Sequence, residues 1–189
     1  TEIGKKEPSA EPLDADAGIK DGVLAVVAAA KEDGDALKMT YSSSSCLSGP
    51  GLRTEVTMPG GHTMTIDEPI TMPGGTNAGA NPLDVFCASF GTCQEITYKM
   101  YGTVMNIPVN SVSCKVTGPC DLRGLVGLGE KMGFDSINGE ITVDSPASAE
   151  QIATLKAAVD GHWAQAWPLS NTVRNPTDTS YVASHRTGI

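Results

Sequence analysis

The sequence predicts a single α+β domain. Two patterns carry this prediction: apolar and polar residues alternate in short segments separated by Gly, Pro and Ser between residues 36 and 67, and residues 82–104 have helical periodicity. Further strand and helix patterns follow with short links, as expected of an α+β fold. A chain of 189 residues with 40% hydrophobic and 19% charged content is long enough to bury one core.

The N-terminal part divides into an arm and a helix. Residues 1–18 are rich in Glu, Asp, Pro and Lys and lack apolar periodicity, which is typical of a mobile arm. A modest helix is predicted over residues 21–33, ending at Gly34. We therefore divide the chain into this arm, a helical extension at 19–35 and a main domain at 36–189.

Three strands are predicted next, at residues 37–41, 52–58 and 62–67. The links between them are short and rich in Ser, Gly and Pro, so we expect an antiparallel meander. The pentapeptide Thr-Met-Pro-Gly-Gly occurs at 57–61 and again at 71–75. A single recurrence is not a repeat architecture, and we interpret both copies as turns.

The helix at 82–104 has a well-defined start. Asn81 suits the N-cap, Pro82 the first helical position, and Asp84 the first turn, where a carboxylate meets free N–H groups. Cys93 falls at the edge of the apolar face. The small residues around it include Gly91, which costs about 1 kcal/mol relative to alanine in a helix interior. Close approach of a second backbone would offset that cost.

The C-terminal part alternates between strands and helices. Strands are predicted at 109–116, 137–143 and 177–183. The segment 121–133 is rich in glycine and is predicted to form a loop. An amphipathic helix is predicted at 148–159, and a short helix, broken at Pro168, within 163–174.

Composition excludes several function classes. A net charge of −9 without a cluster of Lys and Arg argues against nucleic acid and anionic membranes, and the longest apolar run, 23–30, is too short to span a bilayer. Three scattered histidines and no suitable glycine motif predict neither a metal nor a cofactor. Five cysteines without a CxxC pair favour a reducing, cytoplasmic location.

The chemistry of the long helix centres on Cys93, for which two interpretations stay open. Cysteine on an apolar helix face is most often a small hydrophobe. A reactive thiolate needs a nearby cation, because position 93 is too far into the helix for its N-terminal dipole, and Arg53 on an early strand is the most natural candidate. The simplest interpretation of Asp84 is a residue that caps the helix, and that of Phe86 and Phe90 is packing in the core.

An ordered set of motifs resembles the OsmC/Ohr family, the osmotically inducible and organic hydroperoxide resistance proteins. The resemblance covers about residues 36–183 and rests on 62–69, Gly74-Gly75-Thr76, Asn81-Pro82, the helix with Cys93, 121–128 and 168–176. It implies an OsmC-like intertwined homodimer, with antiparallel sheets around long central helices and active sites at the subunit interface. The small residues around Gly91 would then admit a second helix.

The resemblance also implies a chemistry. The cysteine matching Cys93 attacks a peroxide to form a sulfenic acid, an arginine held by a glutamate stabilises the thiolate, and dithiol reductants restore the thiol. Two positions depart from this pattern: Trp167 stands where the resolving cysteine is expected, and Leu83 where the glutamate is expected, with Asp84 one residue later. The chain therefore resembles the OsmC-like branch without the second cysteine. An external thiol, Cys87, Cys46 or another cysteine would resolve the sulfenic acid.

Two functional hypotheses follow. The first is a one-cysteine thiol peroxidase for organic hydroperoxides in oxidative-stress defence: Cys93 reacts, Arg53 and Asp84 assist, and Phe86, Phe90 and Trp167 line an apolar substrate pocket. Its partners are a second copy of the chain and an external thiol or dithiol. The second is a non-catalytic OsmC-like protein that binds an apolar or thiol-reactive small molecule in the same interfacial pocket without turnover.

Overall fold

The computed structural model describes residues 15–47, 50–129, 132–163, 168–175 and 177–184, and it confirms the α+β class. The helices are α1 (Ala15–Glu32), α2 (Pro82–Val104), α3 (Ala149–Trp163) and α4 (Pro168–Arg174), with 3₁₀ turns at Pro59–Gly61 and Arg123–Val126. The strands are β1 (Ser44–Leu47), β2 (Thr54–Thr57), β3 (Thr63–Ile66), β4 (Ser111–Thr117), β5 (Cys120–Asp121), β6 (Gly133–Phe134) and β7 (Asn138–Asp144).

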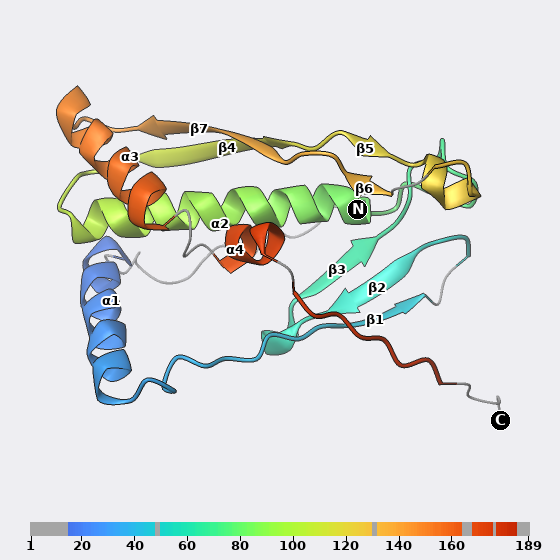
Figure 1. Cartoon of the computed structure of the whole chain (residues 1–189), viewed down its shortest axis with the longest axis horizontal. Coiled ribbons are helices and arrows are strands. Elements are labelled where there is room, and N and C mark those ends of the chain that lie inside the picture. Colours follow the sequence, from blue (N-terminus) through green and yellow to red (C-terminus); the bar gives the residue numbers. More distant parts are fainter. Residues whose placement is uncertain (1–14, 48–49, 130–131, 164–167, 176, 185–189) are drawn as a thin grey trace, which may run out of the picture.

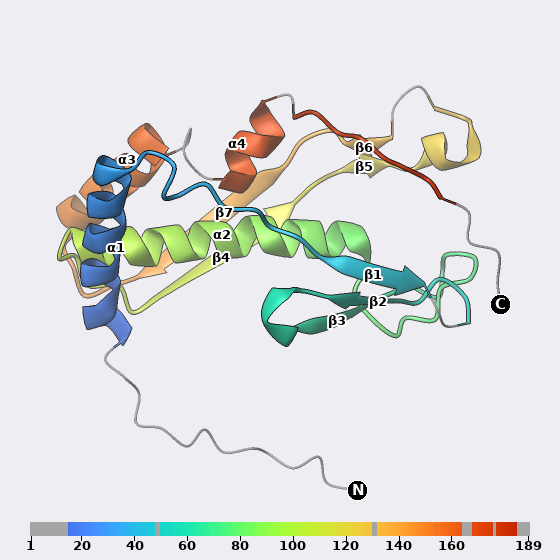
Figure 2. The same cartoon turned by 90° about the horizontal axis from the view of Figure 1, so that it is seen from below.

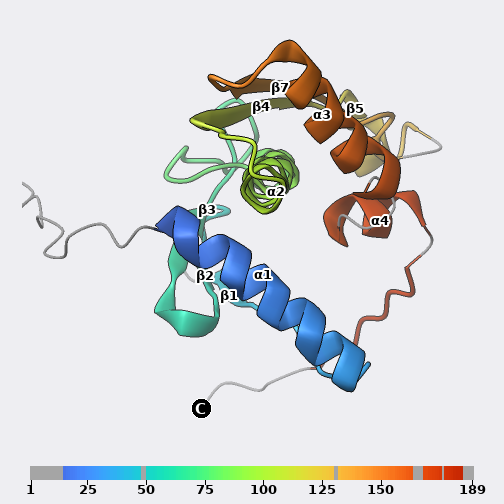
Figure 3. The same ribbon diagram turned by 90° about the vertical axis from the view of Figure 1, so that its left-hand side faces the viewer.

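The long helix α2 organises the molecule. The antiparallel pair β4–β7 covers one side of α2, and α1 crosses the opposite side (Figures 1 and 3). The α3 helix packs beside the C-terminal half of α2 (Figure 1). The antiparallel sheet β1-β2-β3 stands near the other end of α2, separate from β4–β7 (Figure 2). The β4–β7 pair and α1 therefore pack on opposite sides of α2, and the three-stranded sheet extends away from them.

The buried apolar core is small and lies where α2, α3 and the segment before β4 meet. It consists of Tyr98, Ile107, Val109, Leu155 and Val159. No residue of β1, β2 or β3 is buried. Among the described helices, none combines the length and the hydropathy needed to cross a bilayer.

The predicted long helix is confirmed over its full length. The side-chain oxygen of Asn81 accepts a hydrogen bond from the Leu83 backbone N–H at 2.8 Å, and the Asn81 amide donates to Glu68 of the preceding loop. The loop before the cap is held by the buried carboxylate of Asp67, which accepts from the backbone N–H groups of Glu68, Thr76 and Ala78 and from the Thr76 hydroxyl. The loop that precedes α2 is thus ordered around one carboxylate.

Gly91 packs against a strand of its own chain. A Cβ at this position would lie 3.2 Å from Cγ2 of Val116 and 3.6 Å from Cβ of Cys114, both on β4. At Gly91 itself, the element that approaches closely is therefore β4 of the same chain and not a second helix.

Four other predictions are wrong in position or type. The strand predicted at 37–41 lies instead at β1, because cross-strand pairing with β2 decides the register. Residues 177–184, all described, form no strand, and Pro168 begins α4 rather than breaking a helix. The α1 helix begins at Ala15, ahead of the predicted start, because its first residues include strong helix formers.

Candidate active site

Cys93 lies in the middle of α2 and lines an apolar trough of about 1300 Å³ between α1 and α2. We call this space the Cys93 trough. Its side chain is half-buried, and its backbone carbonyl accepts a hydrogen bond from the Thr97 hydroxyl. The walls come from α1, from the segment that follows α1 and from α2, and include Val23, Val26, Met39, Tyr41, Ile96 and Met100. A thiol placed there meets mainly hydrocarbon.

Helical periodicity puts the trough residues on one face of α2. Ser89, Thr92, Cys93 and Ile96 recur at spacings of three and four residues and share that face. The apolar residues of the segment 37–41 alternate as predicted, but they line the trough instead of pairing in a sheet. One basic residue, Lys31 of α1, is among the described lining residues.

Arg53 is held by a neighbour on its own sheet. Its Nε and Nη2 donate to Oε1 of Glu55 at 2.9 and 2.8 Å, and the Thr65 hydroxyl donates to the same carboxylate. The hydrogen bond from Arg53, and then that from Thr65, hold the pKa of Glu55 below its ordinary value. Arg53 does not line the Cys93 trough of its own chain.

Glu55 is a functional candidate that sequence reasoning missed. Two residues along a strand, side chains return to the same face, so an Arg-x-Glu spacing places both groups together. The Arg-x-Glu spacing is the feature of the sequence that could have identified Glu55 as the partner of Arg53.

Asp84 lies elsewhere. It is exposed in the first turn of α2 and lines a separate hollow on the β4 side, together with Cys87, Glu95 and Cys114. Burial, and then the charge of Asp84, raise the pKa of Cys87. The protomer thus does not bring Asp84 to Cys93 or to Arg53.

Of the aromatic residues predicted to receive substrate, Phe86 and Phe90 do not line the Cys93 trough of the protomer. Phe86 stacks on Phe134, with ring centroids 5.5 Å apart and planes at 29°. Phe90 lines a pocket against β7 and α4. Trp167 lies outside the described residues, although the next residue, Pro168, lines the trough.

All five cysteines are free, and they lie at four places in the fold. Cys46 is exposed on β1, Cys87 and Cys114 share the hollow on the β4 side, and Cys120 is on β5. Among the described residues, no second cysteine lines the Cys93 trough. In this part of the chain there is also no group of three metal-ligating side chains suited to hold an ion.

A family model described as OsmC-like protein matches residues 75–182, which is more than half of the chain and includes α2 with Cys93. The chain belongs to the OsmC-like protein family. Among curated proteins no match was found.

Solved structures agree with the OsmC-like fold. An OsmC-like protein from Mycoplasma pneumoniae is 20% identical, with a TM-score of 0.59 over 73% of this chain and 89% of that one. An OsmC-like protein of unknown function from Vibrio cholerae is 11% identical (TM-score 0.56; 71% and 94% covered). An organic hydroperoxide resistance protein from Elizabethkingia anophelis is 19% identical (TM-score 0.51; 74% and 91% covered). At such identities the likeness establishes the fold alone.

Proposed function

We propose that this OsmC-like protein is a thiol-dependent peroxidase that reduces organic hydroperoxides in oxidative-stress defence, with Cys93 as the nucleophile. The observation that carries the proposal is the position of Cys93: a half-buried thiol on the central helix of an OsmC-like fold, facing a large apolar trough. The Elizabethkingia anophelis protein of this fold, named for organic hydroperoxide resistance, supports the same assignment.

The reaction is a two-electron transfer. The Cys93 thiolate attacks one peroxide oxygen, an S–O bond forms as the O–O bond breaks, and the alkoxide leaves as an alcohol after taking up a proton. Cys93 becomes a sulfenic acid. An external thiol then condenses with it, releasing water and forming a mixed disulfide, and a second thiol group restores Cys93. The apolar trough suits the alkyl part of the peroxide.

An external reductant is favoured because, among the described residues of the protomer, no second cysteine lines the Cys93 trough. Cys87 and Cys114 line the opposite hollow of α2. Resolution by either would need α2 to rearrange, whereas a small thiol needs only access to the trough.

We further propose that the working form is a homodimer in which Arg53 serves the Cys93 of the other subunit. The protomer leaves large apolar side chains open on the trough and its surroundings, among them Met39 (70% exposed) and Ile96 (60% exposed), and its three-stranded sheet has no buried residue. Apolar surface of this kind is typical of an obligate interface. A second copy that covers the trough would bring its own β2 with the Arg53–Glu55 pair.

A kinetic assay tests the proposed activity. Stopped-flow measurement with cumene hydroperoxide and excess dithiothreitol should give turnover that is lost in Cys93→Ser and kept in Cys120→Ser, which removes a cysteine on β5 outside the Cys93 trough. Equal turnover by Cys93→Ser protein would end the peroxidase proposal.

A non-catalytic binding function is the second candidate. It is favoured by the trough of the protomer, which is apolar and contains neither Arg53 nor Asp84. Alkylation of Cys93 at different pH values separates the two functions. A rate that rises only towards the thiolate range of free cysteine, near pH 8.5, favours binding, and fast alkylation at neutral pH favours catalysis.

A further inference from the structure

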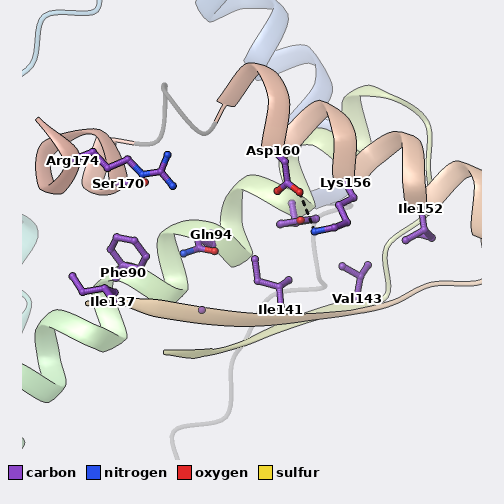
Figure 4. A pocket seen from close by; sticks show the side chains of 12 residues that line it. Phe90, Gln94, Ile137, Ile141, Val143, Ile152, Lys156, Asp160, Ser170 and Arg174 are labelled. Atoms are coloured by element: carbon purple, nitrogen blue, oxygen red, sulfur yellow. Dashed lines mark ion pairs between the residues drawn. The ribbon is translucent and has the colours of Figure 1, made fainter. Parts of the chain in front are cut away.

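A second pocket lies on another face of α2, between α2, β7, α3 and α4 (Figure 4). Its volume is about 530 Å³, within the range of small-molecule sites. We call it the Gln94 pocket. It shares no described residue with the Cys93 trough, and it plays no part in the proposed peroxidase reaction.

Three buried polar side chains line this pocket without a hydrogen-bond partner among the described residues. They are Gln94 (5% exposed), Tyr98 (3%) and Ser170 (4%). Figure 4 shows Gln94 in the space between α2 and β7. Buried polar groups in native proteins are nearly always hydrogen-bonded, so three such groups around one cavity indicate that something in the cavity pairs with them.

The backbone of β7 leaves the side-chain amide of Gln94 uncovered on the pocket side. Gly139 of β7 lies opposite, and a Cβ at that position would stand 3.5 Å from Nε2 of Gln94. Any side chain there would cover the amide. The other lining residues on this side are apolar and include Ile137, Ile141, Val143 and Ile152. The pocket therefore offers polar groups at its centre and hydrocarbon along its walls.

The charged residues at the pocket form one ion pair and leave one arginine without an acidic partner among the described residues. Nζ of Lys156 and a carboxylate oxygen of Asp160, both on α3, are 2.9 Å apart and neutralise each other. Burial, and then the charge of Asp160, raise the pKa of Tyr98, so its hydroxyl stays a donor. Arg174 extends from α4 toward the pocket and has no acidic partner among the described residues (Figure 4). One guanidinium is thus available to an anion.

We propose that the Gln94 pocket binds a small carboxylate with an apolar body. The carboxylate pairs with Arg174, a hydrogen-bonding group of the ligand pairs with Gln94 and Ser170, and the apolar part lies against Ile141 and Val143. A planar carboxylate matches one guanidinium in a bidentate pair. The site is separate from Cys93 and stands whether or not Cys93 is a peroxidase nucleophile.

Calorimetric titration of the full chain with N-acetyl-L-leucine, N-acetyl-L-valine and N-acetyl-L-phenylalanine, each of which carries a carboxylate, an amide and an apolar side chain, tests the proposal. At least one acid should bind, and N-acetyl-L-leucinamide, which lacks the charge, should bind at least tenfold more weakly than N-acetyl-L-leucine if that acid is the ligand. Failure of all three acids to bind, with ordered water alone filling the pocket in a crystal structure, would overturn the proposal.

Variants locate the binding. Gln94→Leu and the exposed Arg174→Gln should each weaken binding of the best acid at least tenfold. Arg123→Gln, which removes an exposed arginine paired with Asp121, and Cys93→Ser should leave it unchanged. Arg174→Gln removes a surface charge and keeps the fold testable if Gln94→Leu is unstable. Undiminished binding to Arg174→Gln would place the acid elsewhere and overturn the assignment.

Discussion

Arg53 and Glu55 form a two-hydrogen-bond ion pair at the start of β2, with Nε and Nη2 at 2.9 and 2.8 Å from one carboxylate oxygen. Thr65, opposite Glu55 on β3, donates to the same carboxylate. The guanidinium is thereby oriented by its own sheet. We propose that Glu55, which holds Arg53, takes the positioning role that the family resemblance assigned to a residue next to Asn81-Pro82.

Glu55→Gln should slow Cys93 oxidation by cumene hydroperoxide about tenfold, because Arg53 loses its anchor. Both partners are about half exposed, so the melting temperature should hardly change. Stopped-flow kinetics and thermal unfolding measure the two effects. Asp84→Asn is the matched control, since Asp84 lies in another hollow and should leave the rate nearly unchanged. A larger loss in Asp84→Asn than in Glu55→Gln would return the role to Asp84.

Gly102→Ala should destabilise the protein. The new Cβ would lie 2.6 Å from Cγ2 of Val109 and 3.1 Å from the carbonyl oxygen of Ile107, both in the core. Overpacking of this kind costs about 1–3 kcal/mol in the free energy of unfolding, which urea denaturation measures. Gly22→Ala in α1, where nothing lies within 4 Å, should instead gain up to about 1 kcal/mol. Equal effects of the two substitutions would contradict the described packing.

Asp67→Asn should lower stability at neutral pH and flatten its acid dependence. Donors from Thr76, Ala78 and Glu68 hold the pKa of Asp67 below its ordinary value of 3.8. Stability from a depressed carboxyl pKa is complete above the ordinary value and is lost as pH falls below it. In thermal unfolding between pH 7 and pH 3, the difference between the two proteins should therefore shrink as the pH falls below 3.8. A constant difference at all pH values would rule out this carboxylate as the cause.

The cysteines should react with iodoacetamide at very different rates. Burial, and then the charge of Glu95, raise the pKa of Cys114, so less thiolate forms at neutral pH. Cys46 is exposed and should be alkylated much faster than Cys114. Mass spectrometry of digested protein after timed alkylation measures both. Glu95→Gln should speed the alkylation of Cys114, and an unchanged rate would mean that access alone limits it.

Local signals predicted α2 well because every determinant of its start is within four residues: Asn81 caps, Pro82 begins the helix and Asp84 meets the dipole. The prediction of a strand at 37–41 was wrong because its determinants are not local. Its alternating pattern is real, but whether such a segment pairs or lines a trough depends on distant residues of α1 and α2.

The site was predictable only in part. The position of Cys93 on one helix face follows from periodicity, whereas the contact of Gly91 with β4 joins residues more than twenty apart and leaves no local pattern. The Arg53–Glu55 pair is local and was missed although its spacing was readable. The grouping of Gln94, Tyr98 and Ser170 brings α2 and α4 together, which only the tertiary fold specifies.

The most direct test of the shared active site is the peroxidase activity of a mixed dimer that pairs one Cys93→Ser subunit with one Arg53→Gln subunit, purified with two different tags. If Arg53 acts on the Cys93 of the other subunit, one site retains both groups, and we expect about half of the wild-type rate while each homodimer is inactive or strongly impaired. A mixed dimer no more active than the two homodimers would contradict the arrangement, because both groups would then have to come from one chain.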